Sequence, residues 1–138
     1  MKMIWLGITI LVLPISHAAF GQSDGRIEAQ YSRYYNDCIN SGDAAQGITV
    51  GILDCNGAEI DRQDARLNQA YKMVMMRLNV AQKAKLRISE RTWIGKRDAR
   101  CRAISASEES GTFGAILYSN CILSETTARR MWLESYKP

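Results

Sequence analysis

Apolar residues recur at helical spacing along two neighbouring stretches of the chain. The first series advances by seven, four, three and four residues, at Ile60, Leu67, Tyr71, Val74 and Leu78. The second series lies further on, at Leu86, Trp93, Cys101 and Ile104. Steps of this kind keep side chains on one face of an α-helix, so each series predicts a helix with one face turned inward. We expect Leu67, Tyr71 and Trp93 in the core of this helix pair.

The two predicted helices meet at Asn79. An Asn side chain accepts hydrogen bonds from the free N–H groups at a helix start, and a Gln three residues later, here Gln82, can return one. We therefore expect the chain to turn near Asn79 and to form a small antiparallel helical hairpin.

Polar residues also lie on or beside the inward faces of this hairpin. Antiparallel pairing places Asp64 within about one helical turn, 5.4 Å, of Arg97. A buried Arg requires a carboxylate partner, because an unpaired buried charge costs several kcal/mol. We therefore predict a buried Asp64–Arg97 pair, in a structural polar network completed by Asn68 and Glu90. The alternative leaves both charged side chains solvated at the rim of the helix pair.

Flanking helices are expected on both sides of the hairpin, which makes the fold class all-α. Tyrosines at helical spacing predict a short helix over residues 26–40, and the first long helix is expected to span residues 49–78. The second long helix is expected to span residues 80–105. Residues 105–119 lack helical periodicity and predict a loop with a short extended piece. Ser124 can cap a last helix.

The first residues have the features of a secretory signal peptide. A positive charge at Lys2 precedes an apolar run over residues 4–15, and residues 16–18 form a small-x-small cleavage signal. We predict a signal peptide over residues 1–18 and a single domain over residues 19–138. The apolar run is shorter than the roughly 20 residues of a membrane span, so we expect a periplasmic or secreted protein without a membrane span after cleavage.

Four cysteines follow this segment: Cys38, Cys55, Cys101 and Cys121. An even number of cysteines in a small exported chain is typical of disulfides, and four cysteines allow three pairings. Pairing of neighbours, Cys38–Cys55 and Cys101–Cys121, closes two short loops and is the arrangement that we predict. A zinc site is the rival, but no pair has CxxC spacing and no histidine follows the signal peptide.

The single histidine, His17, lies in the predicted signal peptide. The chain after it therefore lacks the residue that Ser-His-Asp and Cys-His catalysis require. A pair of carboxylates can hydrolyse a glycosidic bond, but Asp61 and Asp64 lie three residues apart on a predicted helix, which is ordinary for a charged surface. We therefore predict no enzymatic activity, no cofactor and no metal.

Charge gives a weak indication of partners. Removal of Lys2 with the signal peptide leaves 17 Lys and Arg against 14 Asp and Glu, a formal net charge of +3. This mild excess does not predict a nucleic-acid partner. Basic residues do gather in the second helix, where Lys83, Arg87 and Arg91 recur every four residues. A solvated helix face is the expected role, and attraction of an acidic partner is the alternative.

The spacing of the residues singled out above resembles the LprI-like lysozyme inhibitor family of small exported bacterial proteins. The resemblance spans roughly residues 35–133, and its combination of motifs is fairly specific. It rests on Cys38 and Cys55 with a helix between them, Asp64-Ala65-Arg66-Leu67-Asn68, Tyr71, Trp93, Arg97-Asp98, Cys101, Gly111-Thr112, Cys121, Thr127 and Arg129. Glu90 and Thr92 depart from the family's usual Gln and Ala.

The resemblance implies an all-helical, disulfide-stapled domain of the bacterial envelope that binds and inhibits a lysozyme. For such an inhibitor, the expected contact is the loop over residues 107–119, which the cysteines on either side hold in place. Its candidate partner-binding residues are Glu108, Glu109, Thr112 and Phe113. The alternative function is a non-inhibitory periplasmic binding or assembly module that uses the basic helix face.

Overall fold

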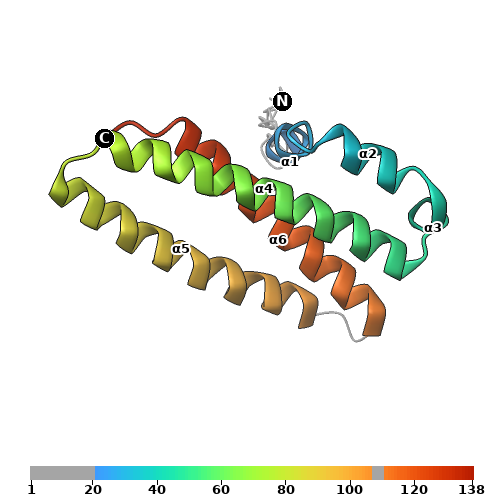
Figure 1. Ribbon diagram of the computed structural model, residues 1–138. Coiled ribbons are helices and arrows are strands. Elements are labelled where there is room, and N and C mark those ends of the chain that lie inside the picture. The colour runs from blue at the N-terminus through green and yellow to red at the C-terminus, as the bar shows by residue number, and fades with distance from the viewer. Residues whose placement is uncertain (1–20, 107–110) are drawn as a thin grey trace, which may run out of the picture.

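The computed structural model describes residues 21–106 and 111–138 (Figure 1). Within these ranges the regular structure consists of α-helices, without a β-strand, so the predicted all-α class is confirmed. The predicted signal peptide, Glu108 and Glu109 lie outside the described residues. The helices are α1 (Gly21–Glu28), α2 (Arg33–Ile39), α3 (Gly42–Ala45), α4 (Thr49–Arg77), α5 (Val80–Ala106) and α6 (Gly111–Glu134).

Three long helices form the body of the molecule. α4 and α5 run antiparallel, as the predicted hairpin requires, and α6 packs along both of them (Figure 1). α4 and α5 pack more closely against α6 than against each other. The short helices α2 and α3 pack on α4, and α1 contacts α6. The predicted hairpin is therefore present, but α6 supplies most of the surface that buries it.

The apolar core lies toward the α4–α5 turn. Its buried members are Leu67, Ala70, Val74, Leu78, Leu86 and Leu133, which come from all three long helices. The α4 members advance by three and four residues, so they share one helix face. Full burial of a leucine side chain stabilises a fold by roughly 1.5–3 kcal/mol, and this cluster is therefore the main apolar contact among the long helices.

The turn between α4 and α5 has the predicted capping box. The Gln82 backbone N–H donates to Asn79 Oδ1 at 2.9 Å, and the Asn79 backbone N–H donates to Gln82 Oε1 at 3.0 Å. These two bonds satisfy N–H groups that the start of α5 would otherwise leave without partners. They explain why one helix ends and another begins without a Gly or Pro.

Both predicted disulfides are present. Cys38–Cys55 joins α2 to α4 with a Cα–Cα distance of 5.8 Å, and Cys101–Cys121 joins α5 to α6 with a Cα–Cα distance of 5.5 Å. Each bridge closes a loop of about 20 residues, a size for which chain entropy predicts about 3 kcal/mol of stabilisation. The bridges tie together the helix ends remote from the apolar core.

Two predicted segments are wrong. The helix expected over residues 26–40 is divided into α1 and α2, because Ser32 begins α2 by accepting a hydrogen bond from the Tyr35 N–H. The loop expected over residues 105–119 is mostly helical, because α6 begins at Gly111 and continues through Ser124. Close packing explains this extension, since a Cβ added at Gly114 would lie only 3.0 Å from the Ser105 carbonyl oxygen.

No helix in the described part of the chain is both long enough and apolar enough to span a bilayer.

Candidate functional site

A groove of about 210 Å³ lies between α4 and α5. It exists because α6 packs against both helices, while the two helices contact each other less closely. Its lining residues are Asp64, Leu67, Asn68, Tyr71, Glu90, Trp93, Ile94 and Arg97. The predicted polar network and the three predicted core residues therefore come together, but around a solvent-facing groove. We call this site the α4–α5 groove.

The apolar side of the groove rests on the core. Leu67 belongs to the buried core cluster, and the half-buried Tyr71 and Trp93 pack against that cluster. Each aromatic ring thus has one part in the core and another part at the groove. Leu67 is thus buried in the core, whereas Tyr71 and Trp93 are only partly buried.

The predicted Asp64–Arg97 pair is absent. Arg97 donates from Nε to Asp98 Oδ1 at 2.9 Å and from Nη1 to Thr126 Oγ1 at 3.4 Å. Asp64 is exposed and accepts a hydrogen bond of 2.9 Å from the Asn68 amide. The insertion of α6 explains the difference, since Arg97 reaches an α6 hydroxyl and its own sequence neighbour. Asp64 can stay hydrated and needs no cation.

Glu90, which was expected to complete the network around Asp64 and Arg97, pairs instead with a residue of α6. Arg129 of α6 donates to Glu90 Oε1 from Nη2 at 2.6 Å and from Nε at 3.0 Å, and Nη2 also reaches Ser89 Oγ at 2.8 Å. Both charged side chains are nearly buried, at 12% and 13% exposure. Such charge-assisted bonds are short and comparatively strong, so they fix α6 against α5.

Two guanidinium groups lie near the Trp93 ring. The Cζ atom of Arg97 is 5.0 Å from the ring centroid, and that of Arg129 is 5.6 Å away. Arg129 lies even closer to Trp132, at 3.9 Å. Cation–π attraction is significant within about 6 Å of a ring centroid. Trp93 is therefore already engaged by the protein's own arginines.

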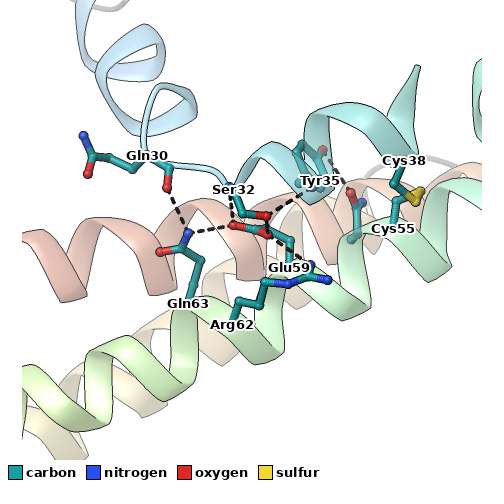
Figure 2. A network of polar contacts seen from close by, with 9 residues as sticks. Gln30, Ser32, Tyr35, Cys38, Cys55, Glu59, Arg62 and Gln63 are labelled. Atoms are coloured by element: carbon teal, nitrogen blue, oxygen red, sulfur yellow. Dashed lines mark hydrogen bonds and ion pairs between the residues drawn. A yellow bond between two sulfur atoms is a disulfide. The ribbon is translucent and has the colours of Figure 1, made fainter. Parts of the chain in front are cut away.

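A second polar cluster, which the sequence did not predict, surrounds Glu59 of α4 (Figure 2). The Glu59 side chain is buried and accepts from the Ser32 backbone N–H at 2.8 Å, from Ser32 Oγ at 2.5 Å and from Gln63 Nε2 at 2.7 Å. Arg62 completes the shell, with Nη1 at 3.3 Å from Glu59 Oε2. We call this cluster the Glu59 layer.

Arg130 of α6 closes this layer on the opposite side of Gln63. The Arg130 side chain is fully buried, and it donates from Nε to Gln63 Oε1 at 2.9 Å and from Nη2 to Gln30 Oε1 at 3.0 Å. Its Nη1 reaches Glu134 Oε2 at 2.6 Å. Gln63 also donates to the Gln30 carbonyl at 3.1 Å. The layer thus joins the α1–α2 connection, α4 and α6.

Hydrogen bonding sets the ionisation of Glu59. Burial by itself raises the pKa of this carboxyl, but the hydrogen bonds from Ser32, Gln63 and Arg62 outweigh burial and leave the pKa below its usual value. Tyr35, which donates to Asn56 Oδ1, has a raised pKa because of burial and the nearby carboxylates of Glu28 and Glu59. Glu59 therefore remains ionised and fully bonded, as a structural group does.

Two of the candidate partner-binding residues, Thr112 and Phe113, lie at the other end of the bundle from the core. Thr112 and Phe113 are exposed in the first turn of α6, and the Phe113 side chain keeps 48% of its surface accessible. They lie near the Cys101–Cys121 bridge in sequence. Glu108 and Glu109 fall outside the described residues, so only their sequence position is known.

The described residues contain no group of three or more His, Cys, Asp or Glu side chains that could hold a metal ion. In the Glu59 layer the Ser32 hydroxyl donates to a buried carboxylate that Gln63 and Arg62 also bond, so this pair is part of the packing between helices. What the groove does offer is an exposed carboxylate, an amide and aromatic surface within one concave site. This arrangement suits the binding of a ligand.

Comparison with known families gives a match that spans most of the features described above. The family described as Lysozyme inhibitor LprI matches residues 38–133, a range that includes both disulfides, the α4–α5 groove and the buried Arg130. No curated protein and no solved structure matches the chain. The match covers more than half of the sequence and agrees with the motif pattern. The chain belongs to the LprI lysozyme inhibitor family.

Proposed function

We propose that this protein is exported to the bacterial envelope, where it binds a lysozyme and inhibits it by occluding the enzyme's cleft. The observation that carries the proposal is the family match over residues 38–133. Inhibition of this kind needs no catalysis, and it requires an ordered surface that fits an enzyme cleft. The predicted signal peptide supplies the route of export.

The end of the bundle where α5 meets α6 is the surface that best suits this task. We call it the stapled end, because the Cys101–Cys121 bridge ties the two helices together beside it. It is formed by two helix ends, whereas the α4–α5 groove is concave and could not enter a cleft. An element that is ordered before binding loses less conformational entropy on association. The exposed Phe113 provides apolar contact area.

The distribution of charged residues also favours the stapled end as the contact. Host lysozymes of the common animal type are basic. Such an enzyme would be attracted by the acidic pair Glu108 and Glu109 in the segment before α6. The cations of α5, including Lys83 and Arg87, would repel it. Complementary charge at the contact raises the association rate and favours the stapled end over the basic helix.

Charge reversal at the two surfaces tests the proposal. Glu108→Lys combined with Glu109→Lys is expected to weaken inhibition of a lysozyme that the wild type inhibits, by about tenfold or more, without lowering the melting temperature. Lys83→Glu combined with Arg87→Glu is the matched control and should leave inhibition unchanged or improved. Inhibition constants from a cell-wall lysis assay measure both. The reverse ranking would place the contact on α5.

A second candidate function is an envelope binding module whose partner is a polyanion. The specific observation is that six cations of α5 make no ion pair within the described residues: Lys83, Lys85, Arg87, Arg91, Lys96 and Arg102. The two carboxylates of α5 are already occupied, Glu90 by Arg129 and Asp98 by Arg97. Four of these cations, Lys83, Arg87, Arg91 and Arg102, lie on one side of the helix, and we call this cationic surface the basic face of α5.

Salt dependence separates the two candidates. If the basic face binds a polyanion, raising salt from about 50 mM to about 200 mM should weaken binding to immobilised polyphosphate by orders of magnitude, because counterion release drives such binding. Arg87→Glu with Arg91→Glu should abolish retention. Inhibition at the stapled end should change only modestly over the same range. If the wild-type protein inhibits no lysozyme but binds polyphosphate, the inhibitor proposal is rejected and the polyanion-binding module is supported.

A further inference from the structure

The ionised groups around the α4–α5 groove do not cancel. Glu90 is neutralised by Arg129 at 2.6 Å, and Arg97 is neutralised by Asp98 at 2.9 Å. Asp64 accepts only the uncharged Asn68 amide and has no cationic partner among the described residues. The groove therefore carries one uncompensated negative charge on a chain whose net charge is positive.

The rest of the groove is mainly apolar. Leu67 and Tyr71 from α4 face Trp93 and Ile94 from α5, and Ile94 is 43% exposed. The volume of about 210 Å³ lies below the roughly 300–1,000 Å³ of pockets that enclose drug-sized ligands. A single long side chain is the size of ligand that such a groove accommodates, and its apolar stem would contact the aromatic and aliphatic walls.

A sugar ring fits these observations less well. Sugar recognition commonly uses an aromatic face as a stacking platform, but Trp93 already has the Arg97 and Arg129 guanidinium groups 5.0 Å and 5.6 Å from its centroid. A neutral sugar would also leave the charge of Asp64 uncompensated. An aliphatic stem that ends in a cation satisfies both the apolar walls and the carboxylate.

We propose that the α4–α5 groove is a receptor for a cationic side chain, a lysine or arginine presented by a partner protein. The head of that side chain pairs with Asp64, and its methylene stem lies along Tyr71 and Ile94. Asn68 holds the carboxylate in place through the bond from its amide. The inference does not depend on lysozyme inhibition, because the groove is separate from the stapled end. The groove would recognise a cationic side chain of any partner protein that presents one.

The test uses the full-length exported protein and small probes observed by NMR. Nα-acetyl-lysine methylamide is the cationic probe, and the norleucine analogue offers a similar stem without the charge. The lysine probe is expected to shift the Trp93 indole N–H and the Tyr71 resonances while leaving Phe113 unmoved. Asp64→Asn should weaken its binding by about fivefold to tenfold. Asp61→Asn is the matched control and should bind as the wild type does, because Asp61 is another exposed carboxylate of α4 that makes no ion pair with the described residues.

Each other outcome overturns the proposal. Equal binding of the norleucine analogue would make the groove a purely apolar site. Equal losses in Asp64→Asn and Asp61→Asn would reduce the effect to general charge. Larger shifts of Trp93 with N-acetylglucosamine than with the lysine probe would make the groove a sugar site. An absence of groove shifts up to the solubility limit of the probe would show that no such receptor exists. None of these results depends on whether the protein inhibits a lysozyme.

Discussion

Arg130→Ala is expected to lower the free energy of unfolding by about 3–5 kcal/mol, because it removes one partner from a buried set of charged and polar groups. Arg130 is fully buried, and its guanidinium bonds to side chains from the α1–α2 connection, α4 and α6. Truncation leaves the amide oxygens of Gln63 and Gln30 without these donors and opens a cavity. Urea denaturation followed by circular dichroism measures the loss.

A neighbouring arginine provides the control for this variant. Arg66 approaches the same carboxylate, Glu134, at 3.9 Å, but its side chain is 48% exposed. Exposed ion pairs contribute about 0–1 kcal/mol, so Arg66→Ala should lie in that range. Arg130→Lys keeps the charge but loses the planar fork, so its stability should fall between those of the wild type and Arg130→Ala. Equal losses for Arg66→Ala and Arg130→Ala would contradict the role assigned to burial.

The long helices of this fold could be predicted because their apolar periodicity and capping residues are local signals. The α4–α5 boundary follows from Asn79 and Gln82 alone, and the structure has both of the expected bonds. The disulfide pairing was also predictable, because short loops close at the least entropic cost. These features depend on residues close together in sequence, so they can be predicted from a single amino-acid sequence.

The start of α6 could not be predicted in the same way. Gly111 and Gly114 weaken helix propensity, and serines near them favour turns. What makes this segment helical is tertiary packing, in which Gly114 allows α6 to approach the Ser105 carbonyl. The Asp64–Arg97 pair and the place of Glu90 beside it were predicted wrongly for a related reason. α6 supplies Thr126 as a partner of Arg97 and Arg129 as the partner of Glu90.

The Glu59 layer was missed although its periodicity is visible in the sequence. The buried face of α4 runs continuously through Cys55, Glu59, Gln63, Leu67, Ala70 and Val74, at steps of three and four. The predicted apolar series began at Ile60, whereas the residue of the buried face at this point is its neighbour Glu59. Glu and Gln are rarely buried, so Glu59 and Gln63 were not assigned to the buried face. Their spacing from Cys55 and Leu67 is nevertheless the spacing of that face.

Glu59→Ala is expected to destabilise the protein by about 3–5 kcal/mol at neutral pH, because it removes a buried carboxylate and leaves several donors unpaired. Those donors are the Ser32 N–H and hydroxyl, the Gln63 amide and the Arg62 guanidinium. Glu59→Gln should cost less, about 1–3 kcal/mol, since it keeps the volume but cannot accept all of these bonds. Chemical denaturation at neutral pH measures both losses.

The pH dependence of these losses distinguishes ionisation from packing. The folded-state pKa of Glu59 lies below the ordinary value of 4.5, so the charged form stabilises the fold. This contribution is fully present above the unfolded-state pKa and is lost as the pH falls through the lower folded-state value. The stability difference between the wild type and Glu59→Gln should therefore shrink as the pH falls from 4.5 toward the folded-state pKa. A difference between wild type and Glu59→Gln that stays constant over this range would mean that shape, and not charge, makes Glu59 necessary.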